Sequence, residues 1–170
     1  MTAQEFVTFR ICDQMFGVSV SEIHDVFRPA AMTPVPLSGP EIAGVLNLRG
    51  RIVTAIDARS RLGLPPSTKS KTCQRLAIGV ERYGESFGLI IDEIGEVVRL
   101  QESELEQNPV NLDATWSGVS RGVYRREDRL LVIMDIDRML AGAGAEEGGQ
   151  PVVRTERVQA DWRMYNGAQI

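Results

Sequence analysis

The fold is decided by residues 7–28, VTFRICDQMFGVSVSEIHDVFR, because the chain repeats this stretch as residues 78–99, IGVERYGESFGLIIDEIGEVVR. The two stretches are 71 positions apart, as Phe16 and Phe87 show. A repeat of this length is what duplication of a folded unit leaves behind. It predicts two related units. The identical pairs are Phe16 and Phe87, Gly17 and Gly88, Glu22 and Glu93, Ile23 and Ile94, Val26 and Val97, and Arg28 and Arg99.

A second pair of matching stretches follows in the same order, now 78 positions apart. The single change of offset indicates a difference in loop length inside one copy. We expect the positions shared by both copies to be scaffold, and the positions that differ to be where function lies. The second set of identical pairs is Gly44 and Gly122, Val45 and Val123, Arg51 and Arg129, Asp57 and Asp135, and Leu62 and Leu140.

Composition excludes several classes of protein. The 170 residues are 43% hydrophobic, which is enough for a core in one domain or two small packed units. A net charge of −4 argues against a nucleic-acid binder, which needs a clustered basic face. The apolar run 130–134 is too short to span a bilayer, and the N-terminus lacks the features of a secretion signal. We expect a cytoplasmic protein without direct membrane insertion.

Histidine and cysteine are scarce. His24 is the single histidine and aligns with Gly95, so we interpret it as a solvated rim residue. Cys12 and Cys73 have no metal or redox spacing, and a disulfide is not expected in the cytoplasm. Since acid–base, nucleophilic and metal chemistry usually use histidine, the sequence weakly disfavours an enzyme. No metal and no cofactor are expected.

Alternating hydrophobic residues predict a mainly β protein. In each copy we expect a strand hairpin, then two more strands, then a short helix with an aspartate cap. Gly17 and Gly88 recur inside strands, which favours bulges or tight bends of small closed barrels. Residues 21–27 fit either one helical turn or a strand, and we favour the strand. The expected strands are 7–11, 16–20, 45–48, 52–56, 76–80, 87–91, 123–124 and 130–134, and the expected caps are Asp57 and Asp135.

The chain divides at two composition changes. Residues 64–72 interpose prolines and polar residues between the copies, so we expect a first unit at about 5–63 and a second at about 73–142. Exchange of strands between the two units stays open. From residue 143 to 170 the glycine-rich and then polar composition predicts a flexible tail, with Trp162 and Tyr165 as isolated aromatics.

The two copies differ most between their shared Gly-Val and Arg. The first copy reads GVLNLRGR over residues 44–51, and the second reads GVYRREDR over residues 122–129. Strand alternation places Asn47 and Arg49 on one face and Leu48 on the other. Two interpretations remain open: a solvated strand end with a glycine turn, or a polar pair that grips a partner, for which arginine offers a planar charged fork.

Residues 44–57, GVLNLRGRIVTAID, resemble the signature of the CheW family of bacterial chemotaxis coupling proteins. Residues 4–18, 87–92 and 130–140 resemble other parts of the same family, so the likeness covers about 4–140, and we expect the domain to span 4–142. It implies two five-stranded barrels of the Src-homology-3 type with a groove between them, and no catalysis. The chain departs from the family at Ala58, where leucine commonly follows the aspartate, and in its tail.

The resemblance also implies partners. Such proteins join chemoreceptors, the methyl-accepting chemotaxis proteins, to the regulatory domain of the histidine kinase CheA in membrane-associated arrays. Kinase contact is expected through apolar barrel surfaces, without assignment to residues. Carried over by motif, the receptor-binding residues are Ile23, Asp25, Val26, Asn47, Leu48, Arg49 and Gly50.

The tail suggests a further partner. Residues 161–165, DWRMY, look like the aromatic tether at the end of some chemoreceptors, which recruits the receptor methyltransferase or methylesterase. Trp162 and Tyr165 would then be the anchors, with the glycine-rich stretch as linker. The alternatives are a chance spacing and docking of Trp162 on a barrel surface.

Three other hypotheses for the function of the whole chain remain open. One is a CheW-like module of a parallel chemosensory system for twitching motility or development. Another is a regulatory domain split from, or paralogous to, the CheA kinase. Kinase activity itself is excluded, because the sequence has no ATP-binding segment or phosphotransfer helix. The third is a carboxylate enzyme built on Asp57 and Asp135, although helix capping explains both residues better.

Overall fold

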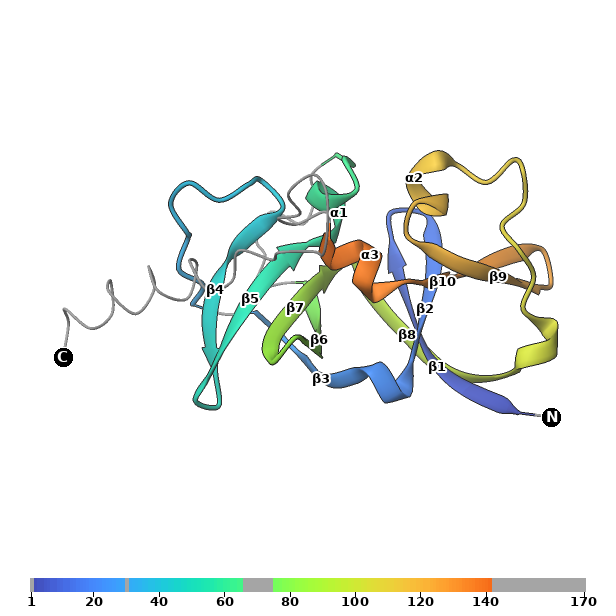
Figure 1. Cartoon of the computed structure of the whole chain (residues 1–170), viewed down its shortest axis with the longest axis horizontal. Helices are drawn as coiled ribbons and strands as arrows, with labels where there is room; N and C mark the ends of the chain where they lie inside the picture. The colour runs from blue at the N-terminus through green and yellow to red at the C-terminus, as the bar shows by residue number, and fades with distance from the viewer. Residues whose placement is uncertain (1, 30, 66–74, 142–170) are drawn as a thin grey trace.

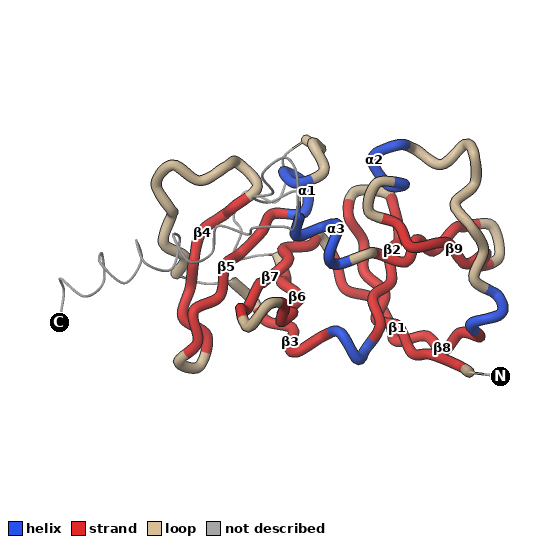
Figure 2. Tube along the Cα trace, viewed as in Figure 1, coloured by secondary structure: helices blue, strands red, loops and turns tan. Residues whose placement is uncertain are grey.

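The computed structural model describes residues 2–29, 31–65 and 75–141. Strands dominate and form two five-stranded sheets that lie side by side (Figure 1; Figure 2). This confirms the mainly β fold with two five-stranded units. In spatial order, barrel A contains β8 (Glu93–Gln101), β1 (Ala3–Ile11), β2 (Gln14–Ser19), β10 (Arg129–Met134) and β9 (Ser120–Arg126). Barrel B contains β3 (Ile23–Phe27), β6 (Leu76–Arg82), β7 (Glu85–Ile91), β5 (Arg51–Asp57) and β4 (Ile42–Leu48).

The helices are short and capped as the sequence predicts. The Asp57 carboxylate accepts hydrogen bonds from the backbone N–H groups of Arg59 and Ser60, and the Asp135 carboxylate accepts one from Arg138. These bonds satisfy donors that have no partner within the helix. Residues 20–22 form one 3₁₀ turn and residues 23–27 form β3, so the preference for a strand is confirmed for 23–27 and wrong for residues 21 and 22. The helical elements are η1 (Val20–Glu22), α1 (Ala58–Arg61), η3 (Glu102–Glu104), α2 (Ala114–Ser117) and α3 (Ile136–Ala141).

The barrels do not follow the repeats. The β1–β2 hairpin belongs to the first repeat, yet β2 pairs in parallel with β10 of the second repeat. In the same way, the β6–β7 hairpin of the second repeat joins β5 of the first. Residues 5–63 and 73–142 therefore each contribute strands to both barrels. The exchange follows from η1 and β3, which carry the chain from barrel A to barrel B (Figure 1).

Each sheet is closed by one pair of reciprocal backbone hydrogen bonds. In barrel B, Thr33 and Val45 each donate an N–H to the other's carbonyl, at 2.8 and 2.9 Å. In barrel A, Glu106 and Val123 do the same, at 2.8 and 2.9 Å. Thr33 follows the edge strand β3 and Glu106 follows the edge strand β8, so each bridge ties one sheet edge to the other. Closure of this kind covers the unpaired edges that an open sheet would expose.

Closure explains the Gly-Val pair that both copies share. Gly44 and Gly122 have φ of 155° and 156°, which L side chains rarely adopt. A Cβ on Gly44 would lie 2.7 Å from the Thr33 carbonyl oxygen, and a Cβ on Gly122 would lie 2.8 Å from the Glu106 carbonyl oxygen. Glycine is thus required where the two backbones meet.

Of the two roles expected for the strand glycines Gly17 and Gly88, a bulge or a tight barrel bend, the structure excludes the bulge. The strand register continues without a shift through both, so their interpretation as bulges is wrong. The register shifts lie elsewhere, as at Ile42 and Gly44. A Cβ on Gly88 would lie 2.8 Å from the Phe27 ring, and one on Gly17 would lie 3.2 Å from Ile133. Both glycines leave space for a side chain from another strand.

The barrels share one hydrophobic core. The largest buried cluster takes side chains from both sheets, whereas two smaller clusters each belong to one barrel. Burial of this apolar surface is the main stabilising contribution, at roughly 25 cal/mol per Å². Members of the shared cluster include Phe9, Phe16 and Val132 from barrel A and Ile78, Phe87 and Leu89 from barrel B.

A buried ion network fixes the junction between the repeats. Arg75, whose side chain is 3% exposed, pairs with Asp57 at 2.9 Å and with Asp92 at 3.2 Å. Asp92 also pairs with Arg59 at 2.7 Å and accepts a hydrogen bond from the Cys12 amide at 2.7 Å. Burial alone would raise the pKa of Asp92, but the hydrogen bonds from Arg59 and Cys12 and the charges of Arg59 and Arg75 outweigh it and lower that pKa.

Replacement of Gly44 by alanine should weaken barrel closure. We expect Gly44→Ala to lower the free energy of unfolding by about 3 kcal/mol, because the strained φ and the clash with Thr33 act together. Gly63→Ala is the matched control, since Gly63 has a φ of 71° but open space around it. That control should cost only about 1 kcal/mol. Equal losses in urea unfolding would contradict the steric explanation.

Removal of the Asp92 charge should reduce the loss of unfolding free energy that occurs at acid pH. A carboxyl with a lowered pKa stabilises the fold above its unfolded pKa of about 3.9, and this contribution disappears as the pH falls through the folded value. We expect Asp92→Asn to cost about 3 kcal/mol at neutral pH and to reduce the drop in unfolding free energy below about pH 4. Asp128→Asn, on an exposed turn, is the control and should leave both quantities unchanged. If the unfolding free energy of Asp92→Asn falls with pH in parallel with that of the native chain, the Asp92 charge does not stabilise the fold.

Candidate functional site

Arg49 lies in the β4–β5 turn at a position that has a positive φ in all four hairpins of the described residues. Arg49 and Gly50 have φ of 53° and 84°, and two positive φ values in succession are typical of a type I′ turn. The Asn47 side-chain oxygen accepts a hydrogen bond from the Gly50 N–H at 2.9 Å. Residues at the start of the other hairpin turns, Cys12, Tyr83 and Glu127, also have positive φ. The positive φ at this position is therefore part of the scaffold, and the side chain at the position is what differs between the hairpins.

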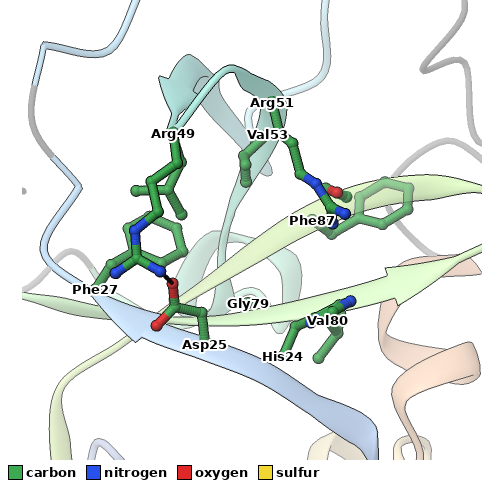
Figure 3. Close-up of a pocket in the computed structure, with 11 residues that line it drawn as sticks. His24, Asp25, Phe27, Arg49, Arg51, Val53, Gly79, Val80 and Phe87 are labelled. Carbon is green, nitrogen blue, oxygen red and sulfur yellow. Dashed lines mark ion pairs between the residues drawn. The ribbon is translucent and has the colours of Figure 1, made fainter.

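Arg49 forms an ion pair across two strands. Its guanidinium lies 3.3 Å from the carboxylate of Asp25 on β3 (Figure 3). The Arg49 side chain is 81% exposed and that of Asp25 is 30% exposed. Exposed pairs contribute at most about 1 kcal/mol to stability. A partner's carboxylate can therefore replace Asp25 as the ligand of Arg49 at small cost.

The ion pair lies at the edge of an open pocket of about 220 Å³. We call it the Asp25–Arg49 groove. Its wall combines aromatic and aliphatic side chains with charged groups at the rim (Figure 3). The close approach of Phe27 to Gly88 sets the position of one aromatic ring. The lining residues are His24, Asp25, Phe27, Leu48, Arg49, Arg51, Val53, Gly79, Val80, Ser86 and Phe87.

A second group of charges borders the groove. His24 Nε2 lies 2.7 Å from one oxygen of Glu81, and Arg51 lies 3.1 Å from the other. The His24 side chain is 53% exposed, which agrees with its interpretation as a rim residue. Glu81 thus holds two cationic or protonatable side chains at one end of the groove.

The structure divides the predicted receptor-binding residues. Asp25, Leu48 and Arg49 line one groove. Ile23 packs against the shared core, and Val26 is 38% exposed on β3 but does not line the groove. Asn47 and Gly50, which bond to each other, shape the turn.

One expectation about these residues is wrong. Strand alternation places Leu48 and Arg49 on opposite faces, yet both line the groove. The reason is that β4 ends at Leu48, so alternation does not extend to Arg49 in the turn.

Sequence reasoning missed several groove residues. Phe27 has a usable signal, since it alternates with Ile23 and Asp25 along β3. Phe87 is shared by both copies, so the repeat predicts a scaffold residue at this position and gives no sign of a role in the groove. Arg51 is shared with Arg129 and is therefore predicted as scaffold. Its pairing with Glu81 at the border of the groove has no sequence signal, because it depends on β5 and β6 coming together.

The arrangement is suited to binding. Within the described residues, no group of three or more metal-ligating side chains comes together. No helix of the described part is long and apolar enough to cross a membrane. Cys12 is a free thiol, and Cys73 lies outside the described residues, as do Trp162 and Tyr165. An apolar wall with an exposed arginine at its rim fits an apolar side chain next to a carboxylate.

Comparison with known proteins identifies similar chains. The family model described as a CheW-like domain matches residues 5–143. Chemotaxis protein CheW of Bacillus subtilis is 29% identical over 139 residues, covering 82% of this chain and 88% of that protein. Chemotaxis protein CheW of Thermotoga maritima is 28% identical over 144 residues, covering 85% and 92%. Protein PilI of Pseudomonas aeruginosa is 28% identical over 126 residues, covering 74% and 70%.

A solved structure has a similar fold. The scaffolding protein TtCheW from Thermoanaerobacter tengcongensis superimposes with a TM-score of 0.74 at 26% identity. The match covers 88% of this chain and 97% of that structure. It therefore includes both barrels.

Asn47→Ala tests the turn that presents Arg49. Loss of the hydrogen bond to Gly50 should destabilise the turn by about 1 kcal/mol, which corresponds to roughly fivefold faster exchange of the Gly50 amide hydrogen. Asn47→Asp is the matched control, because its carboxylate still accepts this bond. If hydrogen exchange at Gly50 is the same in Asn47→Ala and in the native chain, the side chain does not hold the turn.

Proposed function

The chain belongs to the CheW-like domain family, and from this membership we propose that it is a non-catalytic adaptor. It couples chemoreceptors to the histidine kinase CheA in chemotaxis signalling. The relatives named chemotaxis protein CheW and the scaffolding protein of similar structure support this function. The adaptor acts in the cytoplasm, at membrane-associated receptor arrays.

The Asp25–Arg49 groove is the observation that carries the proposal. A chemoreceptor tip is a helical hairpin, and an amphipathic helix binds by placing apolar side chains in a groove. Leu48, Phe27 and Val53 offer the apolar wall, and Arg49 offers a charged fork at the rim. A receptor carboxylate would take the place of Asp25 and so orient the helix. Ile23 and Val26 contribute indirectly, through the position of β3.

The exposed ion pair between Arg49 and Asp25 suits reversible binding of a partner. The turn fixes the backbone at Arg49, and the exposed side chain can exchange one carboxylate for another when a partner binds. Specific but modest contacts of this kind suit an array in which the same interface repeats. The kinase regulatory domain would bind elsewhere, on apolar surface of the barrels.

A second candidate function differs only in the pathway. The similarity to protein PilI favours, more weakly, an adaptor of a parallel chemosensory system such as one for twitching motility. Both versions use the same groove. Purification of the tagged chain from its own cells separates them by the receptor and kinase that accompany it.

A catalytic function has no support from the two shared aspartates. Asp57 and Asp135 both accept hydrogen bonds from the N–H groups of the helices that follow them. Asp57 also pairs with the buried Arg75. Both carboxylates therefore have structural roles that account for their presence in the two copies.

The tail tether remains a separate proposal, because Trp162 and Tyr165 lie outside the described residues. A peptide of residues 158–170 would bind the receptor methyltransferase or methylesterase if the tether exists. Calorimetric titration of the peptide into each enzyme decides this, and the absence of heat with both enzymes would remove the hypothesis.

Arg49→Glu should weaken receptor binding while leaving the fold intact. The substitution places a carboxylate where the partner's carboxylate would bind, and a central anchor of this kind is worth about 1–3 kcal/mol. Receptor co-sedimentation measures the loss, and circular dichroism checks the fold. Arg125→Glu is the control, since Arg125 is 70% exposed and lies on barrel A. Equal binding of a folded Arg49→Glu variant and the native chain would exclude Arg49 from the interface.

A further inference from the structure

Barrel A has a second groove that is the repeat-equivalent of the first. It is lined by Thr8, Met15, Gly95, Glu96, Arg126, Glu127, Asp128, Arg129, Leu130 and Leu131. Under the two sequence offsets, Glu96 corresponds to Asp25, Glu127 to Arg49 and Arg129 to Arg51. We call it the Glu96–Glu127 groove. Duplication has therefore produced two equivalent grooves, each at the gap between the edge strands of its barrel.

The second groove is larger and lacks aromatic lining. Its volume is about 690 Å³, against about 220 Å³ for the first. Phe27 and Phe87 line the first groove, but their equivalents Val98 and Phe16 do not line the second. Deeper in barrel A, Phe6 and Tyr124 fill the interior, and neither of them lines the groove. The space at the mouth is thus available to an aromatic side chain from outside the barrel.

The rim of the second groove carries charges of both signs. Glu96, Glu127, Asp128, Arg126 and Arg129 are all exposed. Within the described part of the chain, none of the five forms an ion pair. In the first groove, by contrast, Asp25 and Arg49 satisfy each other at 3.3 Å. A ligand with one acidic and one basic group beside an aromatic ring would complement this rim.

The chain itself contains such a ligand. In residues 161–163, Trp162 lies between Asp161 and Arg163. The tail starts after α3, whose last residue is Ala141, and 20 residues separate that end from Trp162. Their extended length is up to about 66 Å, which is several times the radius of gyration of about 14 Å expected for a domain of this size. Covalent linkage also gives the tail an effective concentration in the millimolar range, so weak contacts suffice.

We propose that Trp162, with Asp161 and Arg163, docks into the Glu96–Glu127 groove of its own chain. The indole lies against Met15, Leu130 and Leu131, and the flanking residues pair with the rim. Docking closes the second groove and leaves the Asp25–Arg49 groove as the one that partners enter. It also opposes a tether role, because a docked Trp162 is withheld from other proteins. The docking itself does not depend on the adaptor function, whereas its consequence for the entry of partners rests on that proposed function.

Fluorine NMR of the intact chain labelled with 5-fluorotryptophan tests the proposal. Trp162→Phe identifies which of the two tryptophan resonances belongs to Trp162. We expect this resonance to lie away from that of a free tail peptide and to broaden less with a soluble paramagnetic agent. Met15→Glu, which places a charge in the groove wall, should move it to the free-peptide position. Ser86→Glu, at the repeat-equivalent position of the first groove, is the matched control and should leave it unchanged.

Two outcomes of that experiment would overturn the proposal. One is a Trp162 resonance at the free-peptide position in the native chain. The other is a displaced resonance that folded Met15→Glu leaves in place, since the tail would then be bound elsewhere.

A cross-linking measurement covers the case in which Met15→Glu does not fold. The photoreactive residue p-benzoylphenylalanine is placed at position 162 of the otherwise native chain. Intramolecular cross-links to peptides that contain Met15 or Leu130 support docking. Cross-links to another surface, or to a second copy in proportion to protein concentration, contradict it.

Discussion

The structure depends on two places where backbones meet with no room for a side chain. The reciprocal hydrogen bonds of Thr33 with Val45 and of Glu106 with Val123 close the two barrels. Both require a glycine just before the valine, because a Cβ there would lie within 3 Å of a carbonyl oxygen. Closure of barrel B brings the chain after β3 against β4, and in that way places Asp25 within reach of Arg49. The site is thus a consequence of how the barrel closes.

Duplication produced two similar structural units, so that the side chains of one unit could change while its fold was kept. The hairpins of the two repeats are exchanged, and Arg75, Asp57 and Asp92 connect the repeats through buried ion pairs. Neither barrel is built from one repeat alone, and the largest core cluster belongs to both. Rigid elements joined in this way transmit a small displacement at one surface to another surface better than loops do. An adaptor between two partners has use for this property.

Much of the fold could be predicted from the sequence, because its signals are local or repeated. The strands follow from alternation, the caps from Asp57 and Asp135, and the existence of two units from the 71-residue offset. The exchange of hairpins was not decided by these signals, since the two hairpins have the same pattern and either assignment satisfies it. Within the site, Arg49 and Asp25 were found through a family signature. The pairing of Arg51 with Glu81 was missed because residues distant in sequence meet only after folding.

The central claim is that the Asp25–Arg49 groove is where the adaptor receives a chemoreceptor tip. Nuclear magnetic resonance of the isotope-labelled intact chain, titrated with a purified receptor-tip fragment, tests it most directly. We expect saturable chemical-shift changes to concentrate on the backbone amides of Asp25, Leu48 and Arg49. The equivalent positions Glu96, Arg126 and Glu127 in barrel A should stay unchanged. Shifts confined to barrel A, or no shifts at saturating fragment, would contradict the account.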